Sequence, residues 1–257
     1  ENAVSYQGNH TADSELPPPQ RKSYMDQYNL YEPIPGMDQI EVFTGQPSKI
    51  IVAFGDSITA MNRWVKPLQR RLFDAYGGDY ALMNAGIGGN CLLYDIPGLM
   101  GVSYGEKGVS RFERDVLRFS GLCGVILALG VNDVAYYSQK TGAVISLEQY
   151  GSAVTDIVNR LHKAGVRVTA QTLPPRSGFV KKGYTPEMEA LRVSINEWIR
   201  DSALFDYMVD ADALLRDPKN PSFTDERYHQ GDHLHPNQAG GMLLAQTYDL
   251  QKLTGEA

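Results

Sequence analysis

The sequence contains little cysteine, no long apolar run and no excess of positive charge. Cys91 and Cys123 are the only cysteines in 257 residues, too few for a disulfide scaffold and without the Cys-x-x-Cys spacing of zinc and redox sites. No stretch approaches the roughly 18 apolar residues that a membrane-spanning helix needs. The chain carries 24 Lys and Arg against 30 Asp and Glu, a net charge of -6, and such a surface repels nucleic-acid phosphates. We therefore expect neither a membrane span nor a nucleic-acid partner.

Residues 1–48 differ in composition from the rest of the chain. They are polar and contain Pro17-Pro18-Pro19, which favours an extended chain over packed structure. We expect an N-terminal extension or the remnant of a preceding module, with one short strand at residues 40–43, followed by one domain at 49–257. The chain begins with Glu1 and shows no basic-then-apolar signal segment. This predicts a processed or truncated N-terminus and favours a cytoplasmic over a secreted protein.

From residue 49 onward, short apolar runs alternate with amphipathic stretches. The runs typical of strands buried on both faces are residues 50–54, 80–84, 123–129, 166–171 and 207–209. The predicted helices comprise one with Trp64, Leu68 and Leu72 on one face, one over 147–164, one from an N-cap at Thr185 to about Ala203, and one starting near Gln238. Alternation of this kind predicts βαβ units in an α/β domain, with a parallel sheet covered on both faces in three layers.

The two cysteines fall at different ends of these strands. Cys91 follows the second strand and Cys123 begins the third. In a parallel sheet a strand length of about 25 Å separates such positions, which is too far for a disulfide. We expect both to be free thiols and small buried apolar side chains.

Reactive side chains in open parallel sheets gather beyond the carboxyl ends of the strands. A Gly-Asp-Ser segment follows the first strand and presents Ser57 as a candidate nucleophile at a helix start, although an ordinary N-cap is the alternative. Three glycines within residues 86–89 follow the second strand; they leave backbone N–H groups open to a ligand, or they make a tight turn. Asn132 follows the third strand as an amide donor or a turn residue. We expect the neighbouring Asp56 and Asp133 to bond loop backbone.

The segment 231–237 supplies an acid and a histidine within one turn. Asp232 lies three residues before His235, which a proline follows. A serine hydroxyl is a poor nucleophile unless a histidine takes its proton, and that histidine needs a carboxylate to hold its tautomer. Ser57, His235 and Asp232 fit these three roles, with His233 as the competing histidine.

These four segments, in this order, resemble the GDSL or SGNH hydrolase superfamily over most of residues 49–250. The resemblance implies Ser57 as the nucleophile, Asp232 as the acid and His235 as the base of a catalytic triad. It implies a flavodoxin-like α/β/α fold with five parallel strands in the order 2-1-3-4-5. The nucleophile motif reads Gly-Asp-Ser-Ile instead of Gly-Asp-Ser-Leu, a variant that we expect to affect only helix packing.

The same resemblance implies an oxyanion hole formed by Ser57, Gly89 and Asn132, and it implies no cofactor and no metal. The expected activity is serine-dependent hydrolysis of short-chain carboxylic esters through an acyl-enzyme. The expected substrates are small-molecule or carbohydrate esters, with O-acetyl groups on a carbohydrate favoured. Tyr94 and Tyr104, in the Gly- and Tyr-bearing loop that follows the second strand, are the candidate substrate contacts. The sequence gives no indication of an oligomeric state.

Three alternatives stay open at this point. One is a lysophospholipase- or arylesterase-type acylhydrolase. Another is a metal-dependent hydrolase that uses His229, Asp232, His233 and His235 as ligands, although hydrolytic metal sites usually draw ligands from other strands as well. The third is a non-catalytic carbohydrate-binding module, which does not account for the joint presence of Ser57 and His235.

Overall fold

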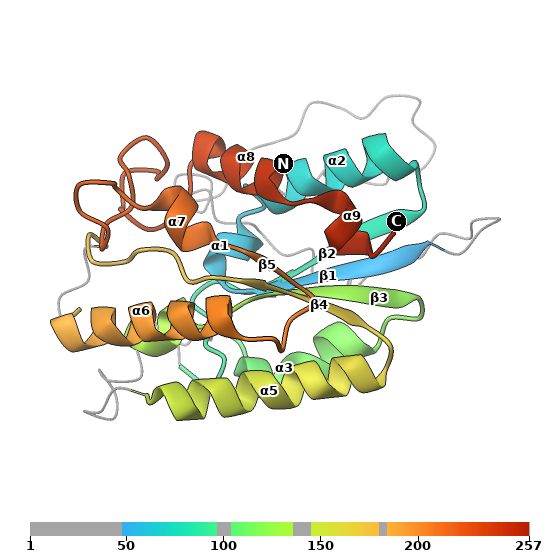
Figure 1. The fold of residues 1–257 in the computed structure, drawn as a ribbon, viewed down its shortest axis with the longest axis horizontal. Helices are drawn as coiled ribbons and strands as arrows, with labels where there is room; N and C mark the ends of the chain where they lie inside the picture. The colour runs from blue at the N-terminus through green and yellow to red at the C-terminus, as the bar shows by residue number, and fades with distance from the viewer. Residues whose placement is uncertain (1–47, 97–103, 136–144, 180–183, 257) are drawn as a thin grey trace, which may run out of the picture. The chain divides into compact units, whose positions relative to one another are not determined.

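The computed structural model describes residues 48–96, 104–135, 145–179 and 184–256. Its centre is a five-stranded parallel sheet with the order β2-β1-β3-β4-β5 (Figure 1). The strands are β1 (Lys49–Gly55), β2 (Tyr80–Gly86), β3 (Leu122–Ala128), β4 (Arg167–Gln171) and β5 (Tyr207–Val209). The predicted fold class and strand order are confirmed. Because all neighbouring strands pair in parallel, their carboxyl ends lie at one edge of the sheet.

Helices cover both faces of this sheet, as Figure 1 shows. The helices packed on one face are α3 (Gly108–Phe112), the π-helical turn η3 (Glu113–Leu117), α5 (Leu147–Lys163) and α6 (Pro186–Asp201). Those on the other are α1 (Ser57–Ala60), α2 (Val65–Tyr76), α7 (Ala211–Leu215), α8 (Gln238–Thr247) and α9 (Leu250–Thr254). Among the described residues, no helix is long and apolar enough to cross a membrane.

The central strand β1 is apolar because it contributes to both cores. Ile51 and Ala53 pack into the cluster under α2 and α8, whereas Val52 and Phe54 pack into the cluster under α3 and α5. All four side chains are fully buried. Successive residues of a strand point to opposite faces, so a strand covered on both sides favours apolar residues at consecutive positions.

The helix boundaries follow local capping signals. Ser146 caps α5, with its hydroxyl accepting from Gln149 N and its own N–H donating to the Gln149 side chain. Thr185 caps α6 ahead of Pro186, as the sequence predicts, with its hydroxyl accepting from Met188 N. This helix ends at Asp201, short of the predicted Ala203, because Ser202 already has an extended backbone with φ -81° and ψ 129°.

Both cysteines are free thiols, as expected. Cys91 is buried, but Cys123 is only partly buried, so the expectation of two buried thiols is wrong for Cys123. Its thiol lies near the amino-terminal end of the sheet, where it donates to Ile50 O at 3.4 Å. The predicted extension at 1–48 and its strand at 40–43 lie outside the described residues, apart from position 48. That domain boundary stays a prediction.

Helix α8 approaches the chain just after α1 through a glycine. A Cβ added to Gly241 would clash with the backbone carbonyl of Arg63, and one added to Gly240 would clash with that of Tyr228. The absence of side chains lets α8 lie directly on these backbone segments. This contact brings the chain that precedes α8 towards α1.

We expect Gly241→Ala to lower the free energy of unfolding by about 1–3 kcal/mol, because overpacking against backbone outweighs the better helix propensity of alanine. Gly78→Ala is the matched control, since a Cβ at Gly78 meets no atom within 4 Å. Urea unfolding of both variants measures the difference. Equal stability of the two variants would show that the close approach of α8 is not required.

Candidate active site

The first candidate residue stands where β1 meets α1. Asp56 has an extended backbone, with φ -103° and ψ -150°, and its carboxylate accepts from Ile58 N at 2.9 Å. Asp56 is therefore the N-cap of α1, and Ser57 is the first residue of the helix. The capping alternative for Ser57 is wrong, because its neighbour performs that role and the Ser57 hydroxyl bonds elsewhere.

Ser57, His235 and Asp232 form one hydrogen-bonded chain. The Ser57 Oγ lies 2.8 Å from His235 Nε2, and His235 Nδ1 lies 2.6 Å from Asp232 Oδ2. The other carboxylate oxygen, Oδ1, accepts from the backbone N–H groups of Leu234 at 3.1 Å and His235 at 2.9 Å. The structure thus brings Ser57 together with Asp232 and His235, which lie 175 and 178 positions later in the sequence.

The environment of Asp232 favours its ionised form. Partial burial alone would raise the pKa of this carboxyl, but hydrogen bonds from the ring and backbone of His235 hold the pKa well below its usual value. Gln230 also donates to Oδ2 at 3.1 Å. A carboxylate fixed in this way orients the imidazole and keeps a proton on its Nδ1, which leaves Nε2 facing the serine.

The turn that carries His235 is held by Asn237, a residue that the sequence analysis missed. Asn237 caps α8 by accepting from Gly240 N at 3.0 Å, and its amide donates to Arg227 O at 2.9 Å and His229 O at 3.0 Å. An Asn directly before a predicted helix is a capping signal, so this role was visible in the sequence.

Asn132 lies in a helical turn at 131–135, just beyond β3. Its side chain is buried, its Nδ2 donates to Asn90 O at 3.0 Å, and its Oδ1 accepts from Arg176 Nη1 at 3.1 Å. The next residue, Asp133, is also buried and accepts from the backbone N–H groups of Leu92 at 2.7 Å and Leu93 at 2.8 Å. The expectation that Asp133 bonds loop backbone is confirmed, as it is for Asp56.

Gly89 follows β2 with a positive φ of 72°. The ring of Tyr104 fills the space where a side chain would lie, since an added Cβ would stand 2.7 Å from two ring carbons. The Asn90 amide holds the same loop by donating to Tyr104 O and Glu106 O, each at 2.8 Å. Tyr104 therefore packs beside the candidate oxyanion glycine. Tyr94 is partly exposed on the segment leading away from it.

The alternative of a metal cluster is not supported by the geometry. His229 Nδ1 already accepts from Gly231 N at 2.9 Å and His233 N at 3.2 Å, and the His229 ring packs 4.3 Å from that of His233. Burial and the neighbouring His233 lower the pKa of His229. Asp232 and His235 are paired with each other. Within the described ranges, no group of three or more His, Cys, Asp or Glu side chains could hold a metal ion.

Comparison with known families agrees with this arrangement. The family described as GDSL-like lipase/acylhydrolase matches residues 53–242. The chain belongs to this family. It is therefore a carboxylic ester hydrolase of the GDSL type, which confirms the resemblance seen in the sequence. No curated protein matches the chain in sequence.

Several solved structures share the fold of this GDSL hydrolase. A GDSL-like lipase from Bacteroides thetaiotaomicron is 18% identical with a TM-score of 0.56, covering 79% of this chain and 89% of its own. The acetyl xylan esterase AlAXEase is 23% identical with a TM-score of 0.55, and the match covers 77% of this chain and 96% of AlAXEase. The psychrotrophic esterase EstA from Pseudoalteromonas, inhibited by monoethylphosphonate, is 18% identical with a TM-score of 0.51, covering 78% and 94%. At these identities the likeness shows the fold alone.

A buried arginine ties the turns of the site together. The Arg111 guanidinium is fully buried and donates to Gly55 O at the end of β1 and Ala85 O in β2, both at 2.9 Å, and to Asn90 Oδ1 at 3.0 Å. It pairs with Asp115 at 3.0 Å. Burial lowers the pKa of the Arg111 guanidinium. No sequence motif marks Arg111, because three of these four partners come from segments at least 21 positions away.

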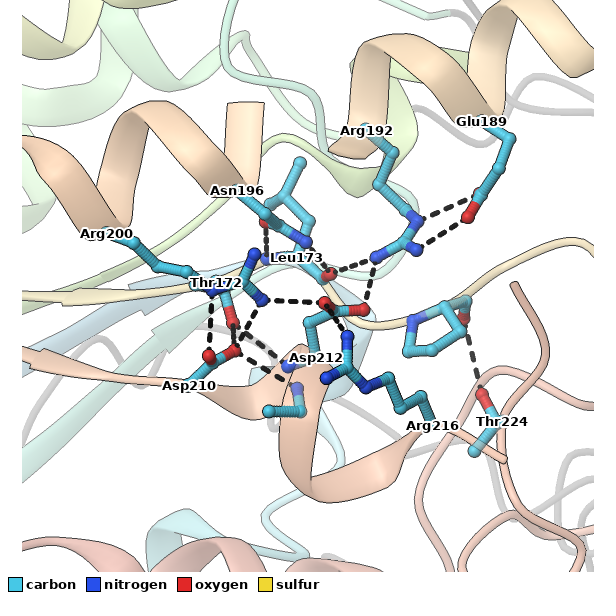
Figure 2. A network of polar contacts seen from close by, with 12 residues as sticks. Thr172, Leu173, Glu189, Arg192, Asn196, Arg200, Asp210, Asp212, Arg216 and Thr224 are labelled. Carbon is cyan, nitrogen blue, oxygen red and sulfur yellow. Dashed lines mark hydrogen bonds and ion pairs between the residues drawn. The ribbon is translucent and has the colours of Figure 1, made fainter. Parts of the chain in front are cut away.

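A second polar network lies beside β4 and β5, as Figure 2 shows. Arg192 of α6 pairs with Glu189 and Asp212, each at 2.6 Å, and donates to Leu173 O at 2.8 Å. Asn196 bonds both backbone groups of Leu173, accepting from its N at 2.7 Å and donating to its O at 2.8 Å. The network therefore fixes the chain that leaves β4 towards the site.

The buried carboxyl groups of Asp56 and Asp133 should make the stability of the fold fall as the pH rises. Burial raises the pKa of Asp56 to about 6 and that of Asp133 to about 7. The unfolded chain ionises these groups near pH 4, so the folded protein binds more protons between pH 4 and 7. Their contribution to stability is therefore present below about pH 4 and is lost as the pH rises towards 7.

We expect Asp133→Asn to reduce the slope with which the free energy of unfolding falls between pH 4 and 7, by at most about 1.4 kcal/mol per pH unit. The free energy of unfolding of wild type and variant, measured in urea from pH 4 to 8, gives the two slopes. Because Asn cannot ionise, the difference between the curves should change only below about pH 7. Parallel curves over the whole range would contradict the raised pKa of Asp133.

The two neighbouring histidines should differ sharply in function. We expect His235→Asn to lower kcat on p-nitrophenyl acetate by at least about a thousandfold, since it removes the serine's proton acceptor. His233→Asn is the matched control, because Asn tolerates the positive φ of 60° at this position. It should retain most of the activity. A larger loss in His233→Asn than in His235→Asn would reverse the assignment of the histidine.

Proposed function

We propose that this GDSL hydrolase cleaves short-chain carboxylic esters by a serine mechanism, with O-acetyl groups on a carbohydrate as its substrates. The observation that carries the proposal is the unbroken hydrogen-bonded chain from Ser57 through His235 to Asp232. Its distances lie within the range expected of a nucleophile, its base and the group that orients the base.

In the first step, His235 Nε2 takes the proton of the Ser57 hydroxyl as the oxygen attacks the ester carbonyl. The alkoxide–carbon bond forms and the carbonyl electrons move to the oxygen, giving a tetrahedral oxyanion. The imidazolium, oriented and stabilised by Asp232, then gives its proton to the leaving alcohol, and the acyl-enzyme remains. In the second step, water loses a proton to His235 and attacks the acyl carbon. The bond between that carbon and Ser57 Oγ then breaks, and the imidazolium returns the proton to Oγ, which releases the acid and restores Ser57 and His235.

The oxyanion would be held by the backbone N–H groups of Ser57 and Gly89 and by the amide of Asn132. Ser57 N lies in the first turn of α1, where backbone N–H groups lack an intrahelical acceptor. The Asn132 amide nitrogen carries two hydrogens, of which one is bonded to Asn90 O. The second can meet the developing charge. Each such donor contributes about 3 kcal/mol to lowering the barrier.

The surroundings of Gly89 support a small acyl group and a sugar alcohol. Tyr104 packs against Gly89 and leaves little room beside that glycine. The ring is partly exposed, as is that of Tyr94 on the same loop, and partly exposed aromatic rings suit stacking on sugars. A protein of the same fold, AlAXEase, is an acetyl xylan esterase, so an acetylated carbohydrate is a substrate class that this fold can serve.

The test is hydrolysis of p-nitrophenyl acetate, butyrate and octanoate by wild type and Ser57→Ala, each with and without EDTA. We expect acetate to be turned over fastest, activity to vanish in Ser57→Ala, and EDTA to have no effect. Ser152→Ala, an exposed serine of α5, controls for serine removal elsewhere. Full activity in Ser57→Ala or abolition by EDTA would refute the serine mechanism.

The substrate class needs a separate comparison. Acetate release from acetylated xylan should exceed fatty-acid release from lysophosphatidylcholine, and both should require Ser57. A preference for octanoate and lysophosphatidylcholine would replace the carbohydrate assignment with a lysophospholipase-type acylhydrolase. That outcome would leave the serine mechanism intact.

A further inference from the structure

We propose that Arg176 is a positioning residue for the oxyanion hole, acting through the side chain of Asn132. This inference rests on the proposed role of Asn132 as an oxyanion donor. Arg176 is 2% exposed and Asn132 3% exposed, and the arginine Nη1 donates to the amide Oδ1 at 3.1 Å. A buried cation is costly unless it is paired or hydrogen-bonded, so its presence beside this amide requires an explanation.

The first effect of Arg176 is to fix which way the Asn132 amide points. A guanidinium carries only donors, whereas the backbone oxygen of Asn90 only accepts. Rotation of the amide by 180° would place its NH2 group against the guanidinium and its oxygen against Asn90 O. Both hydrogen bonds would become repulsive contacts. Arg176 and Asn90 together thus allow a single orientation, in which an N–H remains for the oxyanion.

The second effect is electrostatic. A positive charge bonded to the amide oxygen draws electron density from the amide nitrogen, and this strengthens its N–H as a donor. The effect is larger in a buried site, where little water screens the charge. It also grows as negative charge develops on the substrate oxygen, so it favours the transition state over the bound ester.

The chain that carries Arg176 is anchored closely enough to hold a side chain in one place. Leu173 is bonded through both backbone groups to Asn196 and through its oxygen to Arg192 (Figure 2). Pro175 O accepts from the Thr224 hydroxyl at 3.3 Å. The network shown in Figure 2 is therefore the support of the Arg176 segment.

The same segment also reaches the catalytic histidine. The Arg176 guanidinium lies 5.0 Å from the centroid of the Phe179 ring, and that ring meets the His235 imidazole edge-on with centroids 5.7 Å apart. Residues 176–179 thus contact the Asn132 amide through an arginine and the imidazole of the triad through an aromatic ring.

The test is a double-mutant cycle of Arg176→Met and Asn132→Ala, read as kcat and KM on p-nitrophenyl acetate. Removing one oxyanion donor costs about a hundredfold in kcat, and we expect this for Asn132→Ala. Arg176→Met should lower kcat by about tenfold with little change in KM, because it weakens that donor without removing it. The double variant should be no slower than Asn132→Ala alone, because the proposed effect of Arg176 on the oxyanion passes through the Asn132 amide.

Two further variants separate positioning from folding. Arg71→Met is the matched control, since Arg71 is a partly buried arginine that donates to the backbone carbonyls of Ala245 and Tyr248; its loss should alter stability without altering kcat. Arg176→Lys keeps the charge and a donor and should recover part of the kcat lost in Arg176→Met. If Arg176→Met does not fold, the cycle is run with Arg176→Lys. The smaller loss of kcat in that variant should again vanish in the Asn132→Ala background.

The outcomes distinguish the positioning role of Arg176 from the oxyanion role of Asn132. Losses that multiply in the double variant, or a wild-type kcat in Arg176→Met, would overturn the role of Arg176 and leave the proposed mechanism standing. A wild-type kcat in Asn132→Ala would instead remove Asn132 from the oxyanion hole, and the inference about Arg176 with it. Loss of kcat in Arg176→Met that disappears once Asn132 is gone is the result that supports the proposal.

Discussion

The site depends on the register of β1 between its two neighbours. Gly55 is paired with Gly86 of β2 on one side and with Ala128 of β3 on the other. Because the three strands end level, the residues that follow them leave the sheet at the same edge. Ser57, the turn at 87–90 and Asn132 are therefore brought together by backbone pairing before any side chain contributes. A shift of one residue in either pairing would move one of these segments by about 3.3 Å and turn its side chains to the other face.

Strand pairing alone leaves the turns beyond the strands free to move, and buried side chains restrain them. Arg111 binds the last carbonyl of β1, a carbonyl of β2 and the side chain of Asn90. The Asn90 amide in turn holds the loop at 104–106, and the Asn90 backbone oxygen accepts a hydrogen bond from the Asn132 amide. Each restraint uses a charged or amide group with several donors, which suits a region where backbone carbonyls would otherwise be buried without partners.

Much of this could be predicted from the sequence, and the missing parts share a physical cause. The five strands, the capped start of α6 and the residues of the Ser57–His235–Asp232 chain are marked by local patterns, because apolar periodicity, capping preferences and short motifs act over a few positions. Arg111 and Arg176 carry no such mark. Apart from Asp115, which pairs with Arg111 at i+4 as on many exposed helices, the hydrogen-bond acceptors described above are backbone oxygens and side-chain amides of distant segments. Nothing near either arginine in the sequence separates it from a surface arginine. Cys123 is more exposed than predicted because it is the second residue of β3 and lies near the end of the sheet, where cover is incomplete.

At the end of β1, one residue caps α1 and the next presents its hydroxyl to His235, and a single side chain could not do both. The side-chain oxygen of an N-cap residue accepts hydrogen bonds from N–H groups of the first turn. A serine hydroxyl held in that way could not point at a histidine. With Asp56 as the cap, Ser57 stands one position later, its hydroxyl directed at His235 and its N–H within the first turn. Burial makes the charged cap costly, which is seen in the raised pKa of Asp56, and the charges of Arg176 and Arg111 partly offset that cost. The two arginines near Ser57 thus also stabilise Asp56, the acid that caps α1 and positions Ser57, so removing either of them should weaken the start of this helix as well as the site.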